Sequence, residues 1–403
     1  MKEIQDVVMV SACRTAIGKF MGSLKNVQAI DLAVTAGKEA IKRANIPIDI
    51  VEDIVMGTCL PHMQGSLPAR QAGMAIGLPV SGNACTVNQN CGSGMRALDV
   101  AANHIQLGKT DVALVIGTES MTNSPYMLPK ARMGYRMNAG SIEDSMIHDG
   151  LGDKNIPGHM GMSAENIADK YGITREECDE LALISHQRAT RATQDGTFER
   201  EIVPVEIKGR RGKVTYFAKD EHMIPDANLE AMAKLPAAFK KGGVVTAANA
   251  SGINDAAAAV ILMSKAKALE LGVKPLMKLI NLSAAGVHPS VMGLGPAHAI
   301  PKCLNEAGMK FEDIEYWEIN EAFAAQFIGV GRMLQEEYGI EIDMNKTNLN
   351  GSGIGLGHPV GCTALRIIVS LYYELERQGK TVGGAALCVG GGPALCSLWT
   401  RDI

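Results

Sequence analysis

The sequence has few aromatic residues and no cysteine pattern that would hold a fold together covalently. Its 403 residues include seven Phe, two Trp and eight Tyr, whereas glycine is abundant at 44. The nine cysteines are odd in number and contain no C-x-x-C pair, which argues against a disulfide framework and a structural zinc. This composition predicts an enzyme of helices and sheets with reduced thiols.

Long runs of like charge and long apolar runs are also missing. Lys and Arg number 39 against 43 Asp and Glu, with a net charge of −4, so no basic surface for nucleic acid is indicated. The nearest candidate for a membrane span, AAAAVILM at 256–263, is too short. A strand-like run begins at Asp6 and leaves no room for a signal peptide. We therefore expect a cytoplasmic protein that binds neither nucleic acid nor membrane.

A half-length internal repeat is the most informative feature. The segment CGSGMRAL from Cys91 aligns with HPVGCTAL from His358, and each continues as an amphipathic helix, a G-K-T turn and an apolar strand. Upstream, VEDIVMG at 51–57 aligns with FEDIEYW at 311–317, and DVVMVSA resembles MKLINLSA. Three blocks in one order predict two copies of a strand-helix-strand-helix-strand unit, whose apolar strands are covered by helices on both faces.

The region between the halves breaks this pattern. It contains seven Met between Met121 and Met162, the charged segment HQRATRATQDGTFER, a strand-like IVPVEIKG and the basic turn GRRGK. Such a stretch predicts an inserted loop domain with substrate and subunit contacts. The repeat resumes at 244–263, where we expect a loop, a helix and a strand. The predicted divisions are 1–118 with 246–270, 119–245, and 271–403.

The repeat points to two reactive residues. A two-fold repeat brings equivalent positions together, and here these are Cys91 and His358, each at the start of a helix. Helix N–H groups and a nearby imidazole stabilise a thiolate, so Cys91 is predicted to be a nucleophile of low pKa. Gly92 and Gly94 would let a substrate carbonyl approach the backbone. A buried cysteine can also be only a small apolar residue, but the alignment with His358 favours the nucleophile.

Two further clusters follow strands of the second half, where α/β sheets place reactive groups. One is the segment N-E-A-F that begins at Asn320, which could also be a helix cap. The other is Cys388 followed by the glycines 390–392, whose N–H groups could hold an oxyanion, although they could also form only a turn. The run from Gly92 to Ala97 fits the G-x-G-x-x-A dinucleotide pattern, but VNQN precedes it in place of a hydrophobic strand, which disfavours a nicotinamide cofactor.

Taken together, these motifs resemble the signatures of the thiolases over nearly the whole chain. The matching segments are VNQNCGSGMRAL, NEAFAAQF, GLGHPVG, CVGGG, HMGMSAENIA and NASGINDAAA. The resemblance implies the α/β thiolase fold, with two similar βαβαβαββ halves in five layers, αβαβα, and an inserted loop domain. It implies coenzyme A thioesters as substrates and a dimer built through the core sheets. The Met-rich stretch from Met121 to Met146 offers a further contact surface, so we expect a homotetramer, a dimer of dimers. We expect no metal or organic cofactor.

The resemblance also implies roles for individual residues. Cys91 matches the nucleophile, His358 the base that activates it, and Cys388 the acid and base at the α-carbon. Asn320, through a water and with His358, matches an oxyanion hole for the enolate, and the N–H groups of Cys91 and Gly390 match one for the acyl-enzyme. The contact positions for coenzyme A are His159, Met160, Leu235, Ala250, Ser251 and Phe323.

The reaction implied is reversible Claisen condensation or thiolytic cleavage of acyl-CoA through an S-acyl-cysteine. Two acetyl-CoA would give acetoacetyl-CoA and CoA, or a 3-ketoacyl-CoA and CoA would give acyl-CoA and acetyl-CoA. One alternative is a ketoacyl-synthase-like condensing enzyme, which NEAF disfavours because it stands where a second histidine would be. Another is an inactive CoA-binding scaffold, whose sequence would lack Cys91, His358 or Cys388. Acyl-chain preference, reaction direction, adenine contacts and the choice between dimer and tetramer stay open.

Overall fold

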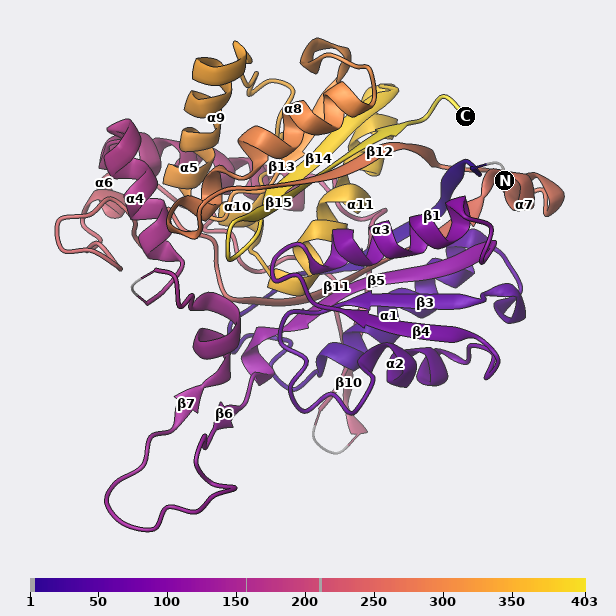
Figure 1. Ribbon diagram of the computed structural model, residues 1–403, viewed down its shortest axis with the longest axis horizontal. Coiled ribbons are helices and arrows are strands. Elements are labelled where there is room, and N and C mark those ends of the chain that lie inside the picture. The colour runs from indigo at the N-terminus through magenta and orange to yellow at the C-terminus, as the bar shows by residue number, and fades with distance from the viewer. Residues whose placement is uncertain (1–3, 157, 210–211) are drawn as a thin grey trace.

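The sequence repeat folds into two matching sets of strands and helices (Figure 1). The computed structural model describes residues 4–156, 158–209 and 212–403. The first set consists of β1 (Val7–Thr15), α1 (Ala29–Ala44), β3 (Asp53–Gly57), α2 (Pro68–Ile76), β4 (Asn83–Val87), α3 (Ser93–Gln106), β5 (Val112–Ser120) and β11 (Asn254–Ser264). The second consists of β12 (Met277–Gly286), α8 (Pro296–Glu306), β13 (Tyr316–Ile319), α9 (Ala324–Tyr338), α11 (Val360–Gln378), β14 (Val382–Cys388) and β15 (Pro393–Thr400).

The two sets pair their strands in the same way. The first forms the order β4-β3-β5-β11-β1 and the second β13-β14-β15-β12. Strand β3 pairs parallel with β5 in the first set, and β13 pairs parallel with β14 in the second. The last two strands of each set in chain order, β5 with β11 and β14 with β15, pair antiparallel. A single bridge between Trp317 and Thr347 stands in the second set where the first has β4. A short antiparallel contact of β1 with β12, at Val8 and Met9, joins the two sheets.

The helices complete five layers, which confirms the predicted αβαβα arrangement. Helices α1 and α2 cover the outer face of the first sheet, and α8, with α9 beside it, covers the outer face of the second. Helices α3 and α11 pack against each other between the sheets, and α11 contacts strands of both. The central core contains Leu98 of α3 and Leu365 of α11. Burial of such side chains, about 1.5–3 kcal/mol each, holds the halves together.

The alanine run in the first half differs from expectation. A helix is expected between 244 and 263, but the sequence from Asn254 to Ser264 forms one continuous strand, β11. All its residues are buried, and it lies between β1 and β5. Alanine favours helices in isolation. Here pairing with two neighbouring strands overrides that preference, and the small side chains let helices approach the sheet.

Residues 119–245 contain helices as well as loops. Glu119 and Ser120 still belong to β5, beyond the expected division at 118. Helices α4 (Gly161–Tyr171) and α5 (Arg175–Gln194) lie beside α9 of the second half. The strand-like IVPVEIKG forms β8 (Ile202–Val203) and β9 (Val205–Lys208), and β9 pairs with β10 (Val214–Phe217). The expected turn GRRGK lies partly outside the described residues.

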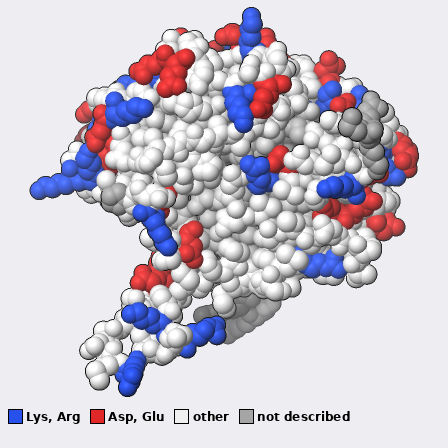
Figure 2. All heavy atoms as spheres, viewed as in Figure 1, with Lys and Arg blue, Asp and Glu red and all other residues white. Residues whose placement is uncertain are grey.

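A hairpin formed by β6 (Tyr126–Met127) and β7 (Glu143–Asp144) projects away from the layers (Figure 1). Its tip exposes large apolar side chains, including Met133 at 88% and Met137 at 83%. Figure 2 shows Lys and Arg side chains on this hairpin, whereas charges of both signs are interspersed over the rest of that face. An exposed apolar hairpin of this kind is typical of a contact surface.

None of the helices in the described ranges is long and apolar enough to cross a membrane.

Candidate active site

A cavity of about 330 Å³ opens between the two halves and the inserted region. Three predicted catalytic residues line it: Cys91 before α3, His358 before α11, and Cys388 at the end of β14. All three side chains are buried. The remaining wall is mostly apolar and contains Met121, Leu151, His159, Met160, Ala238, Phe239, Thr246, Ala247, Ala250, Ser251, Gly252, Ile253, Met292, Ala322, Phe323 and Val360.

His358 is held as a neutral imidazole with one nitrogen free to accept a proton. Its Nδ1 lies 2.7 Å from Oγ1 of Thr363, and that hydroxyl donates to the carbonyl of Pro359 at 3.0 Å. The hydroxyl must therefore accept from Nδ1–H, which leaves the lone pair on Nε2. Nε2 has no hydrogen-bond partner among the described residues. Burial, with a smaller effect of Arg366, lowers the pKa of His358 to about 3.

Cys91 differs from the sequence prediction of a thiol with low pKa. Burial raises the pKa of Cys91 to about 11 and outweighs the N–H group of Gly390, which donates to the sulfur and lowers it. The thiol hydrogen is directed to Oδ1 of Asn90 at 3.1 Å. The free-energy cost of removing a thiolate from water exceeds the stabilisation that the N–H groups of Gly390 and Cys91 give it. In the free protein Cys91 is therefore a thiol, and a base has to remove its proton.

Cys388 is also a buried thiol. Burial and the neighbouring Cys91 raise the pKa of Cys388 above its ordinary value. After it the chain turns through Gly391 and Gly392, which have φ of 88° and 110°. These angles suit glycine, and they bring the Gly390 N–H to the sulfur of Cys91.

Asn320 lies at the end of β13 and is fully buried, but it does not line the cavity. Its backbone N–H donates to Ala386 at 3.0 Å. Neither Oδ1 nor Nδ2 of its side chain has a hydrogen-bond partner among the described residues. An unpaired buried amide costs roughly 1–3 kcal/mol, so packing alone does not account for an asparagine at this position.

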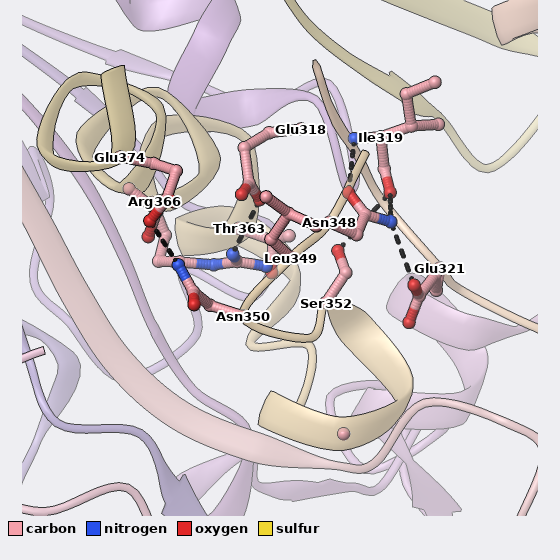
Figure 3. A network of polar contacts seen from close by, with 12 residues as sticks. Glu318, Ile319, Glu321, Asn348, Leu349, Asn350, Ser352, Thr363, Arg366 and Glu374 are labelled. Atoms are coloured by element: carbon pink, nitrogen blue, oxygen red, sulfur yellow. Dashed lines mark hydrogen bonds and ion pairs between the residues drawn. The ribbon is translucent and has the colours of Figure 1, made fainter. Parts of the chain in front are cut away.

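A buried polar network fixes the segment around Asn320 (Figure 3). Asn348 accepts from the N–H of Ile319 at 2.9 Å and donates to its carbonyl at 2.7 Å and to Glu321 at 2.9 Å. Figure 3 also shows Arg366 of α11 reaching Glu318 of β13, an ion pair of 3.6 Å. The network ties β13 to the chain that leads into His358.

The predicted coenzyme A contacts divide into two groups. His159, Met160, Ala250, Ser251 and Phe323 line the cavity, and Ala250 and Phe323 are joined by a β-bridge.

The sixth predicted contact, Leu235, and the predicted oxyanion donor, Gly390, lie outside that wall. Leu235 is 37% exposed and does not line the cavity. Gly390 is not part of the wall either, but its N–H reaches Cys91.

Three residues that shape the site were not predicted. Phe239 stacks on His159 with ring centroids 4.6 Å apart and planes at 17°, and its aromatic character in a sequence with few aromatics was an available signal. Asn90 precedes the nucleophile, and the sequence shows it only as one residue of the motif VNQNCGSGMRAL, with no sign of its contact to the thiol. Glu119 has no local sequence signal, because its partners are distant in the chain.

Glu119 is a buried carboxylate that joins three segments. It accepts from Thr58 Oγ1 at 3.0 Å, from the N–H of Cys59 at 2.8 Å and of Leu60 at 3.2 Å, and from the N–H of Gly361 at 2.9 Å. Burial raises the pKa of Glu119 to about 7 despite these donors. It therefore fixes the first turn of α11, directly after His358.

Within the described ranges, no three His, Cys, Asp or Glu side chains lie close enough together to hold a metal ion.

Known proteins resemble this chain over its full length. Residues 7–266 match the family model described as the thiolase N-terminal domain, and residues 273–401 match the thiolase C-terminal domain. An acetyl-CoA acetyltransferase of Syntrophomonas wolfei is 48% identical over 390 residues, which cover 96% of this chain and 97% of that protein. One from Escherichia coli K12 is 44% identical over 99% of this chain and all of its own length.

Solved structures agree with this result. The structure of an acetyl-CoA acetyltransferase from Syntrophomonas wolfei superposes with a TM-score of 0.97 at 62% identity and covers both chains completely. A human mitochondrial 3-ketoacyl-CoA thiolase superposes with a TM-score of 0.93 at 37% identity, over 98% of this chain and 99% of its own. The chain belongs to the thiolase family and is an acyltransferase.

Proposed function

We propose that this thiolase makes and breaks the carbon–carbon bond of 3-ketoacyl-CoA through an acyl group carried on Cys91. The observation that supports this most is the meeting of two thiols and one neutral imidazole in a single apolar cavity between the halves. Claisen chemistry needs a nucleophile, a base for the α-proton and donors for two oxyanions. The cavity and its rim offer each of them.

The first half-reaction transfers the acyl group to the protein. His358 Nε2 takes the proton of Cys91 while the sulfur attacks the thioester carbonyl, and the negative charge moves to the carbonyl oxygen. The N–H groups of Cys91 and Gly390 stabilise that oxygen. The carbonyl reforms as the CoA thiolate leaves and takes the proton of the Cys388 thiol, so Cys388 is left as a thiolate while His358 keeps the proton of Cys91.

The second half-reaction forms the new bond. Cys388, now a thiolate, removes an α-proton from a second acyl-CoA, and the protonated Nε2 of His358, together with Asn320 acting through a water, stabilises the resulting enolate. The enolate carbon attacks the acyl carbonyl on Cys91, and Cys91 leaves as a thiolate that takes back the proton from His358, so all three groups return to their neutral forms. Because burial raises the pKa of Cys388, its thiolate is a strong base once formed. Thiolysis is the same sequence in reverse.

Acetyl-CoA and acetoacetyl-CoA are the substrates we propose, since relatives named acetyl-CoA acetyltransferase cover nearly the whole chain. His159 stacked on Phe239 and the bridge from Ala250 to Phe323 form the apolar wall along which pantetheine would lie. A ketoacyl-synthase-like reaction is less well supported, because Asn320 and Cys388 replace a second histidine. An inactive scaffold is disfavoured by the intact set of Cys91, His358 and Cys388.

We further propose that the enzyme needs no cofactor besides its CoA substrates, acts in the cytoplasm, and assembles as a homotetramer. The exposed apolar hairpin β6–β7 supports the assembly.

Steady-state assays test the proposed function. Purified protein is assayed for thiolysis of acetoacetyl-CoA and of longer and branched 3-ketoacyl-CoA, with Cys91→Ala as the control. We expect Cys91-dependent thiolysis, with acetoacetyl-CoA the best substrate. No thiolysis of any member of the panel would refute the proposal, and a clear preference for long chains would refute the substrate assignment.

A further inference from the structure

The residue before the nucleophile makes unusual contacts with it. Asn90 has a left-handed backbone with φ of 47°. Its Oδ1 lies 2.8 Å from the backbone nitrogen of Cys91 and 3.1 Å from the sulfur, and both groups donate to it. Its Nδ2 donates to the carbonyl of Gly150 at 2.9 Å. One carboxamide thus holds both the N–H and the S–H of the nucleophile.

The chemistry of the neighbours fixes which way this carboxamide points. The N–H of Cys91 can only donate, so the oxygen must face it. The carbonyl of Gly150 can only accept, so the nitrogen must face that side. An exchange of the two atoms would lose both hydrogen bonds, and the orientation is therefore determined by two independent partners.

The carboxamide also packs against the glycine loop after Cys388. A Cβ atom built on Gly390 would lie 3.0 Å from Cγ of Asn90. Gly390 donates its N–H to the sulfur of Cys91. In the proposed mechanism the substrate's carbonyl oxygen accepts from the N–H groups of Cys91 and Gly390. Asn90 Oδ1 already accepts from the N–H of Cys91. The Asn90 carboxamide also lies against Gly390, which supplies the second donor.

A thiol that donates to a carboxamide oxygen is favoured over a thiolate, because the oxygen would face the negative charge. The nitrogen that should accept this proton, Nε2 of His358, has no partner among the described residues. In the free protein the thiol is therefore directed to Asn90 and not to its base.

We propose that Asn90 is a positioning residue that keeps Cys91 as a hydrogen-bonded thiol until the thioester carbonyl displaces Oδ1 from the Cys91 N–H. This inference rests on the proposed function. Once Oδ1 leaves, the thiol loses its acceptor and turns to His358. Activation of the nucleophile is thereby coupled to substrate binding, and the free enzyme is protected against electrophiles.

Two substitutions separate the carboxamide from the backbone. Asn90→Gly removes the side chain and keeps the left-handed conformation at no steric cost. Asn90→Asp keeps the shape and the acceptor and adds a negative charge beside the sulfur. Gln89→Gly is the matched control, because it loosens the same loop while its side chain accepts from Arg96 and not from the thiol.

The measurement is the rate at which iodoacetamide modifies Cys91 in the absence of substrate, followed against pH and located by peptide mass spectrometry. We expect Asn90→Gly to react about tenfold faster near neutral pH, as one unit of pKa implies, and Asn90→Asp to react more slowly than wild type. Gln89→Gly should keep the wild-type profile. Unchanged profiles in both Asn90 variants, or an equal shift in Gln89→Gly, would overturn the proposal.

Turnover gives a second readout. Asn90→Gly should show a lower KM for the acyl donor with kcat little changed, because the carbonyl no longer has to displace an internal acceptor. A raised KM would instead mean that the carboxamide helps to bind substrate, which contradicts the proposal. Failure of the proposed function is distinct from both results, since it would appear as absent thiolysis in the wild-type protein.

Discussion

At the scale of single residues, the site is assembled from neutral groups. The imidazole of His358 is uncharged because burial lowers its pKa to about 3, and the pKa of Cys91 is raised to about 11. The reacting groups are buried and the cavity wall is mostly apolar, so forming charge in advance would be costly. Charges therefore arise only during reaction, when substrate oxygen atoms and backbone donors are in place.

The contact between His358 and Thr363 carries a prediction. Thr363→Val removes the acceptor for Nδ1–H, so the imidazole loses its fixed tautomer. We expect kcat/KM to fall by about tenfold, the effect of roughly 1.4 kcal/mol. Thr363→Ser keeps a hydroxyl and should retain most of the activity. Steady-state kinetics at pH 7 measures both, and equal losses in the two variants would show that packing, not the hydrogen bond, matters.

At this scale the sequence predicts which residues lie together in the site, but it does not predict which of them carry a proton. The repeat places Cys91 opposite His358 because equivalent helix starts share one pseudo-axis. The pKa of Cys91 could not be predicted in the same way, since it depends on the walls that Met121 and Met160 contribute from elsewhere in the chain. Helix N–H groups act locally and are visible in sequence, whereas desolvation is a property of the folded cavity.

At the scale of elements, Glu119 connects β5, the loop after β3 and the start of α11. Glu119→Gln should destabilise the protein by about 2–5 kcal/mol, because one carboxylate oxygen becomes an NH₂ group that faces two N–H or O–H donors. Activity should fall too, because Gly361 is close to His358. Urea unfolding and thiolysis assays measure the two effects.

A matched control for this substitution is Glu52→Gln. Glu52 also accepts from a hydroxyl and a backbone N–H, those of Thr110 and Asp111, but it is exposed and its contacts lie away from the cavity. The Glu52→Gln substitution should therefore leave the rate of thiolysis unchanged. A Glu119→Gln protein with wild-type stability and activity would show that the carboxylate does not hold α11.

Elements also show where sequence reasoning fails. The order of strands and helices follows from the repeat, and the structure has both halves as expected. The run at 256–259 is four alanines, which favour a helix locally, and only the pairing of β11 with β1 and β5 makes it a strand. Long-range pairing of this kind leaves no mark on local composition.

At the scale of the whole molecule, buried and partly buried histidines affect acid stability. Burial lowers the pKa of His222 to about 4 and of His358 to about 3, against about 6.5 in an unfolded chain. Below pH 6.5 the unfolded chain binds protons that the folded protein does not, so each histidine reduces stability as pH falls. Buried carboxyls such as Glu119 have a raised pKa and therefore increase stability as pH falls, against the effect of the histidines. For this reason the prediction compares the pH dependence of stability in the wild type with that in a variant lacking one histidine.

His222→Gln removes one of these groups. Its unfolding free energy should decrease less than that of wild type between pH 7 and pH 5, by about 2 kcal/mol. Urea unfolding at the two pH values measures this. An identical decrease in both proteins would mean that His222 is protonated in the folded state.

The projecting hairpin makes a prediction about assembly. Met133→Asp with Met137→Asp should turn the proposed tetramer into a smaller species, because two highly exposed apolar side chains become charged. Leu269→Asp is the control, since Leu269 is 68% exposed on α7 (Lys265–Glu270), away from the hairpin. Sedimentation velocity at micromolar concentration distinguishes them. A stable monomer in wild type would contradict the assembly proposal.

The central claim is that Cys91 of the first half carries the acyl group and Cys388 of the second half acts at the α-carbon. Mapping of the acylated residue tests this claim most directly. Wild type, Cys91→Ala and Cys388→Ala are each incubated with acetyl-CoA, quenched with acid, and mapped by peptide mass spectrometry, while acetoacetyl-CoA is measured in parallel. We predict one acetyl group on Cys91 in wild type and in Cys388→Ala, none in Cys91→Ala, and no condensation by Cys388→Ala. Acetyl on another cysteine, or near-normal condensation without Cys388, would contradict the account.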